Sequence, residues 1–181
     1  MDIDDAAALL RGAVPTGAGT WADFGAGTGT FTRALATLLG EGGMVYAVDA
    51  DAGAVRALRE LRELVRPNEA GIVPVEADFN RDIEPSTVNA PLDGVLLANS
   101  LHFTRDQVGV LSRLAAAVRT GGRVVVVEYD RRQASHWVPY PIAEAEWPRL
   151  AVAAGLADPT ITGRRRSMYS GSLYVGVALK E

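Results

Sequence analysis

The sequence predicts an α/β fold built on one mostly parallel, seven-stranded sheet that ends in an antiparallel hairpin. Three observations predict this class. Short apolar runs alternate with segments of helical periodicity along the chain. The apolar runs show no inside–outside alternation, which is typical of parallel strands covered on both faces. The last two strand-like runs leave no room for a helix between them, so we expect them to pair antiparallel.

The first half of the chain contains three expected strands separated by two helices. We expect the strands at Trp21–Ala26, Met44–Val48 and Gly71–Val75. Apolar residues recur at helical spacing from Phe31 to Leu39 and from Val55 to Val65. A glycine and a proline follow these two segments and end the helices.

The middle of the chain continues this alternation. A fourth strand is expected at Asp93–Asn99, and a fifth, which contains the sequence VVVV, at Arg123–Tyr129. Thr104 and Gln107 form a capping-box pattern in front of a helix that reaches Val118. Right-handed crossovers between such strands give a doubly wound, Rossmann-like sheet.

The C-terminal part supplies the hairpin. A helix is expected at Ala143–Ala154, and strands are expected at Asp158–Thr162 and Tyr169–Leu179. The linker between these strands, Gly163–Ser167, includes the three arginines Arg164 to Arg166. We expect this basic linker to be a solvated hairpin tip.

Composition limits the classes of function. The 181 residues suit a single domain spanning 1–181, and the apolar fraction of 48% indicates a globular protein. A formal net charge of -4 disfavours a nucleic-acid partner. The chain has no cysteine, and no histidine and acid set has metal-ligand spacing, so we expect no bound metal. No apolar run reaches the roughly 18 residues of a membrane span, and the N-terminus is acidic, so a cytoplasmic protein is expected.

The string DFGAGTGT, at the end of the first expected strand, is the strongest functional signal. A nucleotide-triphosphate loop needs a Gly-Lys pair, which the chain lacks. A dinucleotide loop prefers a third glycine where Thr30 stands. S-adenosylmethionine carries an ammonium group, so its site needs an acid as well as backbone N–H groups. Asp23, directly before the glycines, can supply that acid.

This string resembles motif I of the class I S-adenosylmethionine-dependent methyltransferases, and further landmarks follow in the family's order. They are VYAVDAD after the first helix, EADF after the third strand, LDGVLLANSLHF along the fourth strand and RTGGRVVVVEY along the fifth. HWVPYPI and the following Trp147 resemble a group of small methyltransferases. The resemblance implies S-adenosylmethionine as the cofactor, with ribose at Asp49 and adenine at Asp78 and Phe79. The implied cofactor-binding residues are Asp23, Gly25, Gly27, Gly29, Asp49, Ala50, Asp78, Phe79 and Asn99.

Candidates for chemistry lie where the later strands end. His102 follows the fourth strand at the sheet edge where ligands bind in doubly wound folds, and it can act as a general base near neutral pH. It can equally be a structural histidine. Other side chains are candidates for the substrate pocket: Tyr129, Asp130, His136, Trp137 and Tyr140.

The sequence leaves three functions open. The first is methyl transfer to a small-molecule acceptor, the second a non-catalytic S-adenosylmethionine-binding or partner-binding module, and the third a nicotinamide-dependent oxidoreductase. The N-terminal segment is short, with only Asp4 to Arg11 able to cover the pocket. The pocket is therefore open, or it is covered by Arg131 to Pro141, or it is covered by another subunit in a homo-oligomer.

Overall fold

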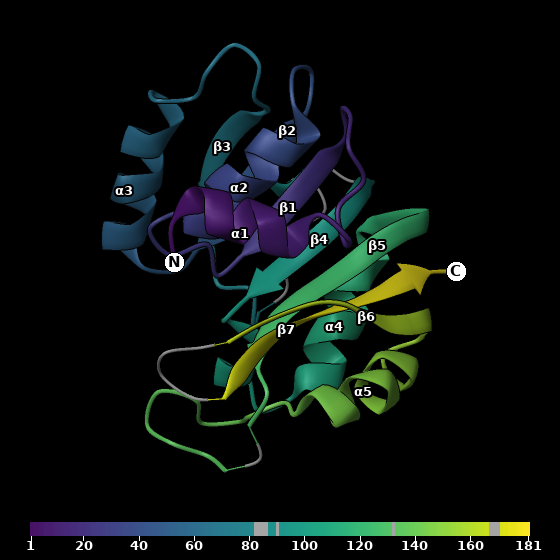
Figure 1. Cartoon of the computed structure of the whole chain (residues 1–181). Coiled ribbons are helices and arrows are strands. Elements are labelled where there is room, and N and C mark those ends of the chain that lie inside the picture. Colours follow the sequence, from purple (N-terminus) through teal and green to yellow (C-terminus); the bar gives the residue numbers. More distant parts are fainter. Residues whose placement is uncertain (82–86, 90, 132, 167–170) are drawn as a thin grey trace.

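The computed structural model describes residues 1–81, 87–89, 91–131, 133–166 and 171–181. Seven strands form one sheet in the order β3-β2-β1-β4-β5-β7-β6 (Figure 1). Strands β1 to β5 pair in parallel, and β7 runs antiparallel to both β5 and β6. The predicted fold class is therefore confirmed, with the last strand inserted inside the sheet. The strands are β1 Thr20–Phe24, β2 Met44–Asp49, β3 Gly71–Glu76, β4 Leu92–Ala98, β5 Val118–Tyr129, β6 Leu156–Arg166 and β7 Ser172–Lys180.

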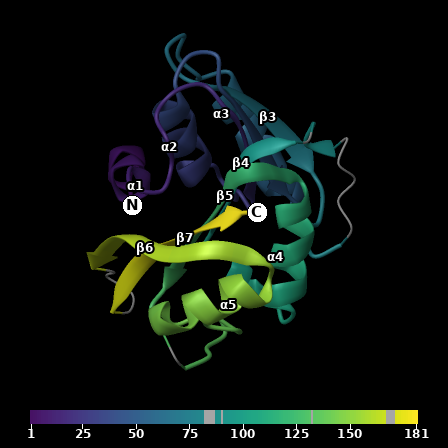
Figure 2. The same ribbon diagram turned by 90° about the vertical axis from the view of Figure 1, so that its right-hand side faces the viewer.

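Helices cover both faces of the sheet. The first three pack on one face and the last two on the other, as the two views show (Figures 1 and 2). Short 3₁₀ turns, η2 Leu101–Phe103 and η3 Glu144–Glu146, precede α4 and α5. Within the described ranges, no helix is long and apolar enough to cross a membrane. The helices are α1 Ile3–Leu10, α2 Thr30–Leu39, α3 Ala52–Arg62, α4 Gln107–Ala116 and α5 Trp147–Ala153.

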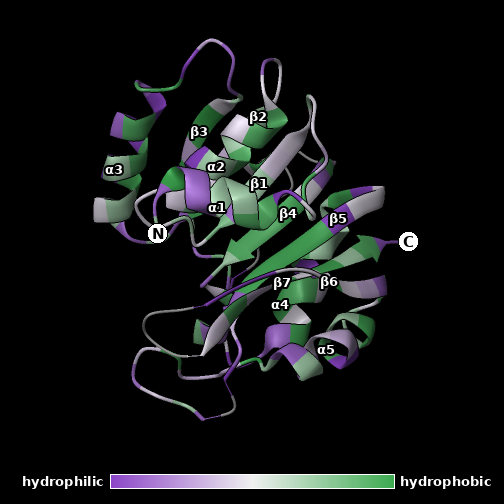
Figure 3. Ribbon diagram, viewed as in Figure 1, coloured by the Kyte–Doolittle hydropathy of each residue, from purple (hydrophilic) through white to green (hydrophobic). Residues whose placement is uncertain are grey.

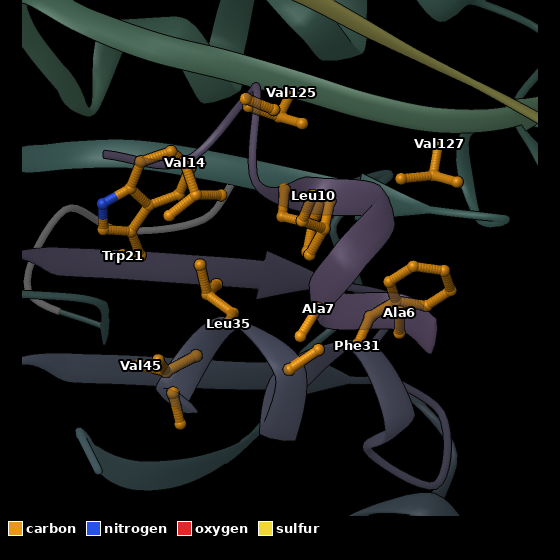
Figure 4. Close-up of a cluster of buried hydrophobic side chains, with 14 of the residues drawn as sticks. Ala6, Ala7, Leu10, Val14, Trp21, Phe31, Leu35, Val45, Val125 and Val127 are labelled. Atoms are coloured by element: carbon orange, nitrogen blue, oxygen red, sulfur yellow. The ribbon is translucent and has the colours of Figure 1, made fainter. Parts of the chain in front are cut away.

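The core explains why the central strands are so apolar. Strand β4 and the second half of β5, with its four consecutive valines, are hydrophobic and buried (Figure 3). On the α1 side, Leu10 and Leu35 are fully buried and pack between α1, α2 and the sheet (Figure 4). Trp21 lies in the same cluster, and its ring occupies the space above Gly94, where a Cβ would come within 2.5 Å of it. Burial of such side chains stabilises the sheet by about 1.5–3 kcal/mol each.

Some predicted boundaries are wrong, and local hydrogen bonds explain why. Strand β1 ends at Phe24 because the N–H groups of Gly25 and Ala26 both donate to the carbonyl of Val48, which turns the chain. The cap of α4 is Asp106, whose carboxylate accepts the N–H of Gly109, and not Thr104. The hydroxyl of Thr104 donates instead to a side chain in the loop after β3.

The sheet also extends beyond two predicted strands. Strand β5 begins at Val118, where a helix end was expected, because Val118 pairs with Leu92 of β4. Strand β6 continues through Arg166, so the residues Gly163 to Arg166 are not a linker. Ser167 and residues 169–170 of the predicted hairpin lie outside the described residues. The predicted cap of α3 is confirmed, because the carboxylate of Asp51 accepts the N–H of Ala54.

Candidate functional site

The loop after β1 and the segment after β4 lie at the switch point of the sheet. Strand β1 pairs with β2 on one side and with β4 on the other, so the connections leave these strands in opposite directions. Ligands of open α/β sheets bind outside the carboxyl ends of the strands at such a point. Gly25 to Gly29 and Asn99 come directly after the two strands. The topology therefore brings the glycine loop and Asn99 to one edge.

The three glycines of the loop differ in what they make possible. All have a positive φ, of 76° at Gly25, 55° at Gly27 and 90° at Gly29. A Cβ on Gly25 would lie 2.5 Å from Ser100, and one on Gly29 would lie 2.4 Å from Leu61 of α3. A Cβ on Gly27 would meet no atom of the described residues within 4 Å. Gly25 and Gly29 therefore permit close packing, whereas Gly27 leaves backbone exposed to open space.

Asp23 is a fully buried carboxylate beneath this loop. Its Oδ2 accepts the hydroxyl proton of Thr32 at 2.6 Å, whereas Oδ1 is buried with no hydrogen-bond partner in the described part of the chain. Burial raises the pKa of Asp23 to about 7, against the Thr32 hydrogen bond and with a smaller contribution from the charge of Asp49. An unpaired buried polar atom is unfavourable. The free oxygen therefore indicates a place for a donor or a cation.

Asp49, the last residue of β2, connects its strand to the glycine loop. Its Oδ2 accepts the N–H of Gly27 at 2.8 Å, and its Oδ1 accepts the N–H of Asp51 at 2.9 Å. Ala50 lies exposed in the bend between the two aspartates. A carboxylate has about four acceptor positions, so Asp49 can accept further hydroxyl groups while it holds the loop.

The segment after β3 places one of its two predicted residues beside the loop. The buried ring of Phe79 lies 6.4 Å from the ring of Phe24 and would be 3.2 Å from a Cβ on Gly25. The carboxylate of Asp78 instead accepts the backbone and side-chain N–H groups of Asn80 and pairs with Arg81. Asp78 thus shapes the turn that carries Phe79.

Two cavities open at this edge of the sheet, and they share Asn99 and Tyr129. The first, of about 560 Å³, we call the N-terminal cavity. The second, of about 520 Å³, we call the aromatic cavity, and it is lined by Asn99, His102, Phe103, Tyr129, Arg131, Trp137 and Val138. The N-terminal cavity is lined by Met1, Asp2, Asp5, Ala26, Thr28, Thr30, Phe31, Asn99, Tyr129, Arg165, Arg166 and Leu173.

Asn99 has an unusual backbone at the boundary of the two cavities. Its φ of 54° lies in the left-handed region, which a residue other than glycine rarely adopts. Its N–H donates to the carbonyl of Val127 of β5, which fixes this conformation, and its side-chain Oδ1 is buried with no partner among the described residues. Strain of this kind is often found at ligand sites.

His102 forms a buried pair with a residue that the sequence did not single out. Its Nδ1 lies 2.6 Å from Oε2 of Glu128, and its backbone N–H donates to Oε1 of the same carboxylate at 3.2 Å. Both side chains are almost fully buried. Burial raises the pKa of Glu128, and the contacts with His102 oppose that rise. The sequence did contain a signal, because an acid within the buried run VVVVEY is unfavourable unless it is paired.

The predicted substrate residues are only partly brought together. Tyr129 and Trp137 line the aromatic cavity. Asp130, His136 and Tyr140 are not among its described lining residues. The carboxylate of Asp130 accepts the N–H of Glu144, the exposed His136 stacks edge-on against Trp137, and the N–H of Tyr140 donates to the carbonyl of His102.

The three arginines near the C-terminus, expected at a solvated tip, belong to β6. The guanidinium of Arg164 binds both carboxylate oxygens of Glu144, and that of Arg165 pairs with Asp5 of α1 at 2.6 Å. Arg165 and Arg166 line the N-terminal cavity, together with Asp5. The helix α1 therefore contributes to the wall of the N-terminal cavity, and the loop containing Trp137 contributes to the wall of the aromatic cavity.

Metal ligands do not gather at this edge. Across the residues described, no group of three or more His, Cys, Asp or Glu side chains is arranged to hold an ion.

Comparison with known proteins decides the family. A family model described as a methyltransferase domain matches residues 22–124, which is more than half of the chain. The chain belongs to this family. The matched range includes the glycine loop, Asp49, Asn99 and His102 of the methyltransferase. A search of curated protein sequences found no match.

Solved structures share the fold of this methyltransferase at low sequence identity. A SAM-dependent methyltransferase from Aquifex aeolicus is 17% identical with a TM-score of 0.73, over 98% of this chain and 90% of that one. Magnesium protoporphyrin IX methyltransferase from Synechocystis PCC 6803, solved with bound SAM, is 19% identical with a TM-score of 0.65, over 99% and 78%. An arsenic(III) S-adenosylmethionine methyltransferase from Chlamydomonas reinhardtii is 17% identical with a TM-score of 0.70, over 97% and 69%.

Proposed function

We propose that residues 1–181 form one S-adenosylmethionine-dependent methyltransferase domain that acts on a small-molecule acceptor. The observation that carries this proposal is the glycine loop itself: Gly27 faces open space and is held by the carboxylate of Asp49, and the buried carboxylate of Asp23, directly before the loop, has one oxygen without a partner among the described residues. The family match alone does not distinguish a catalytically active member from an inactive one, so catalytic activity is part of the proposal.

The residues present fit the cofactor at each of its ends. The free Oδ1 of Asp23 suits the ammonium group, and exposed backbone at Gly27 suits close approach of the methionine part. The unused acceptor positions of Asp49 suit the two ribose hydroxyls, beside Ala50. Phe79, which Asp78 holds in its turn, suits an adenine ring. The bound cofactor supplies an electrophilic methyl group on a sulfonium sulfur.

The acceptor would occupy the aromatic cavity. Asn99 and Tyr129 border both cavities, so a methyl group delivered beside Asn99 would lie at the mouth of the aromatic cavity. A volume of about 520 Å³ lies within the range of about 300–1,000 Å³ that is typical of small-molecule sites. The acceptors named for two of the structural neighbours, a porphyrin and arsenic(III), are chemically unrelated, so they support methyl transfer without indicating an acceptor.

A methyl-transfer screen tests the proposal. The purified chain is mixed with S-adenosylmethionine carrying a deuterated methyl group and with pools of metabolites, and products are read by mass spectrometry. We expect at least one product that gains the labelled methyl group and is lost in Asp49→Ala. Cofactor binding without transfer to any pool would favour the non-catalytic module.

A further inference from the structure

His102 and Glu128 have the arrangement of a base and its orienting acid. Both side chains are almost fully buried, and His102 is one of the residues that line the aromatic cavity. Glu128 holds Nδ1 of His102 at 2.6 Å. No hydrogen bond to Nε2 is found in the part of the chain that the structure describes. A histidine kept only for packing would be expected to have both ring nitrogens satisfied.

The carboxylate fixes the ring in one tautomer and orientation. A second hydrogen bond, from the backbone N–H of His102, holds the other oxygen of Glu128, so the carboxylate cannot rotate away. With Nδ1 donating to Glu128, Nε2 is the acceptor nitrogen of the neutral ring. Among the described residues, the ionisable groups in this region include Tyr129 and Arg131 at the cavity and Tyr174 of β7, which is the sheet partner of Glu128. A negative charge behind the ring stabilises the imidazolium that forms when Nε2 accepts a proton.

The rest of the lining indicates which acceptor this base serves. Phe103, Trp137 and Val138 give the cavity apolar and aromatic walls, and the side chains of Phe103 and Trp137 are more than half exposed although they are large and apolar. The Phe103 ring centroid lies only 4.4 Å from that of His102. Rings of this kind stack on a flat aromatic ligand. A ligand stacked there would bring its edge substituents to Nε2 of His102.

We propose that His102 is the general base for methylation of a hydroxyl group on an aromatic ring, with Glu128 as its positioning residue. This inference rests on the proposed function. The acceptor O–H bond breaks and its proton passes to Nε2 of His102. The acceptor oxygen forms the new O–CH₃ bond while the S–CH₃ bond breaks and its electron pair stays on sulfur, which leaves a neutral thioether. The imidazolium then returns its proton to water.

The nature of the nucleophile explains why a base is needed here. A phenol has a pKa near 10, so only about one molecule in a thousand is ionised at neutral pH. Thiols ionise more readily, and an aromatic amine attacks with its free electron pair. A base positioned on the ring edge therefore accelerates transfer to oxygen and has little effect on sulfur or nitrogen.

Three acceptors that differ in one atom test the proposal: phenol, thiophenol and aniline. We expect His102→Asn to lower kcat for phenol by about 10²- to 10⁴-fold at pH 7 and to leave KM and the thiophenol and aniline rates unchanged. The phenol deficit should shrink as the pH rises towards 10. Glu128→Gln should reduce kcat for phenol alone, by a smaller factor. Equal loss with all three acceptors, or no loss with phenol, would overturn the assignment.

A binding measurement gives a readout that does not depend on turnover. 4-Nitrophenol absorbs at a longer wavelength as the phenolate, so its ionisation can be followed in the presence of S-adenosylhomocysteine. We expect wild type to hold the bound probe as phenolate at a pH where His102→Asn holds it neutral. A wild-type protein that binds no probe, or binds only the neutral form, contradicts the inference.

Two controls separate the possible failures. Glu69→Gln removes another buried carboxylate, one that pairs with Arg33 beside α2, and should leave both readouts unchanged in the folded protein. Calorimetry with S-adenosylhomocysteine on the same samples reports the proposed function. If S-adenosylhomocysteine binds but no phenolate of the probe forms, only the assignment of His102 as the base fails. If it does not bind, the proposed function fails.

Discussion

At the scale of single residues, Asp23 couples the stability of the protein to pH. Its carboxylate is fully buried and only one oxygen has a partner. Because burial raises its pKa from 3.8 to about 7, the native state binds more protons than the unfolded state between these values. The free energy of unfolding contributed by Asp23 therefore falls as the pH rises through that window, and it stays low above it.

Replacing this carboxylate should stabilise the protein without its cofactor. A shift of about three pH units corresponds to roughly 4 kcal/mol. We expect Asp23→Asn to match wild type near pH 4 and to exceed its free energy of unfolding by up to that amount at pH 8. Urea denaturation of both proteins from pH 4 to 8 measures the difference. Two curves that stay parallel across this range would show that Asp23 is not protonated on folding.

Gly27 allows conformational strain to be separated from ligand contact. Gly155, between α5 and β6, also has a positive φ and open space where a Cβ would lie. Alanine at either position should lower the free energy of unfolding by about 1–2 kcal/mol, because a left-handed backbone is unfavourable for it. Only Gly27→Ala should also weaken binding of S-adenosylhomocysteine, by about tenfold or more, or about 1.4 kcal/mol. Denaturation and calorimetry measure both effects, and equal affinity in the two variants would remove Gly27 from the site.

The sequence singled out candidate residues for this site but did not give the contacts that they make. Asp23 and Gly27 were predicted because their spacing in one short segment carries the signal, and their role stays a prediction. Glu128 was missed because its role depends on contact with a residue 26 positions away along the chain. For the same reason, the carboxylate of Asp130 was expected in the pocket but binds the backbone at η3.

At the scale of elements, the alternation of strands and helices was predictable and several ends were not. Periodicity depends only on which residues within one short segment are apolar, so the local sequence predicts it. The start of β5 at Val118 depends on pairing with Leu92, and the length of β6 depends on β7. Two residues before α4 could cap it, the hydroxyl of Thr104 and the carboxylate of Asp106, and the sequence favoured Thr104. In the structure it is Asp106 whose oxygen accepts a backbone N–H of the helix, that of Gly109.

The helix α1 is the element whose packing is easiest to test. Leu10 is fully buried between α1, α2 and the sheet (Figure 4). Val152 of α5 is mostly exposed. We expect Leu10→Ala to lower the free energy of unfolding by about 2–5 kcal/mol. Val152→Ala should change it by no more than about 0.5 kcal/mol. Chemical denaturation of the two variants measures both, and similar values would mean that α1 is not docked as described.

At the scale of the whole molecule, the order of the strands creates the site. Because β1 lies between β2 and β4, the glycine loop, Asp49 and Asn99 meet at one edge although they are far apart in the sequence. Both cavities extend from this edge to Tyr129 at the end of β5, and the N-terminal cavity also reaches Leu173 of β7. A ligand that bridges these segments should stabilise the folded chain, by about 2.7 kcal/mol at a hundredfold excess over its Kd.

Calorimetric titration with S-adenosylhomocysteine tests the central claim most directly, with two neighbouring aspartates as a matched pair. We expect one molecule to bind per chain, and Asp49→Ala to weaken binding by about 1–3 kcal/mol, or about 5- to 150-fold. Asp51→Ala removes only the cap of α3, so it should lower stability by about 0.5–2 kcal/mol and leave affinity unchanged. No binding to the folded wild-type protein, or equal affinity in Asp49→Ala, would contradict a cofactor site at the end of β2.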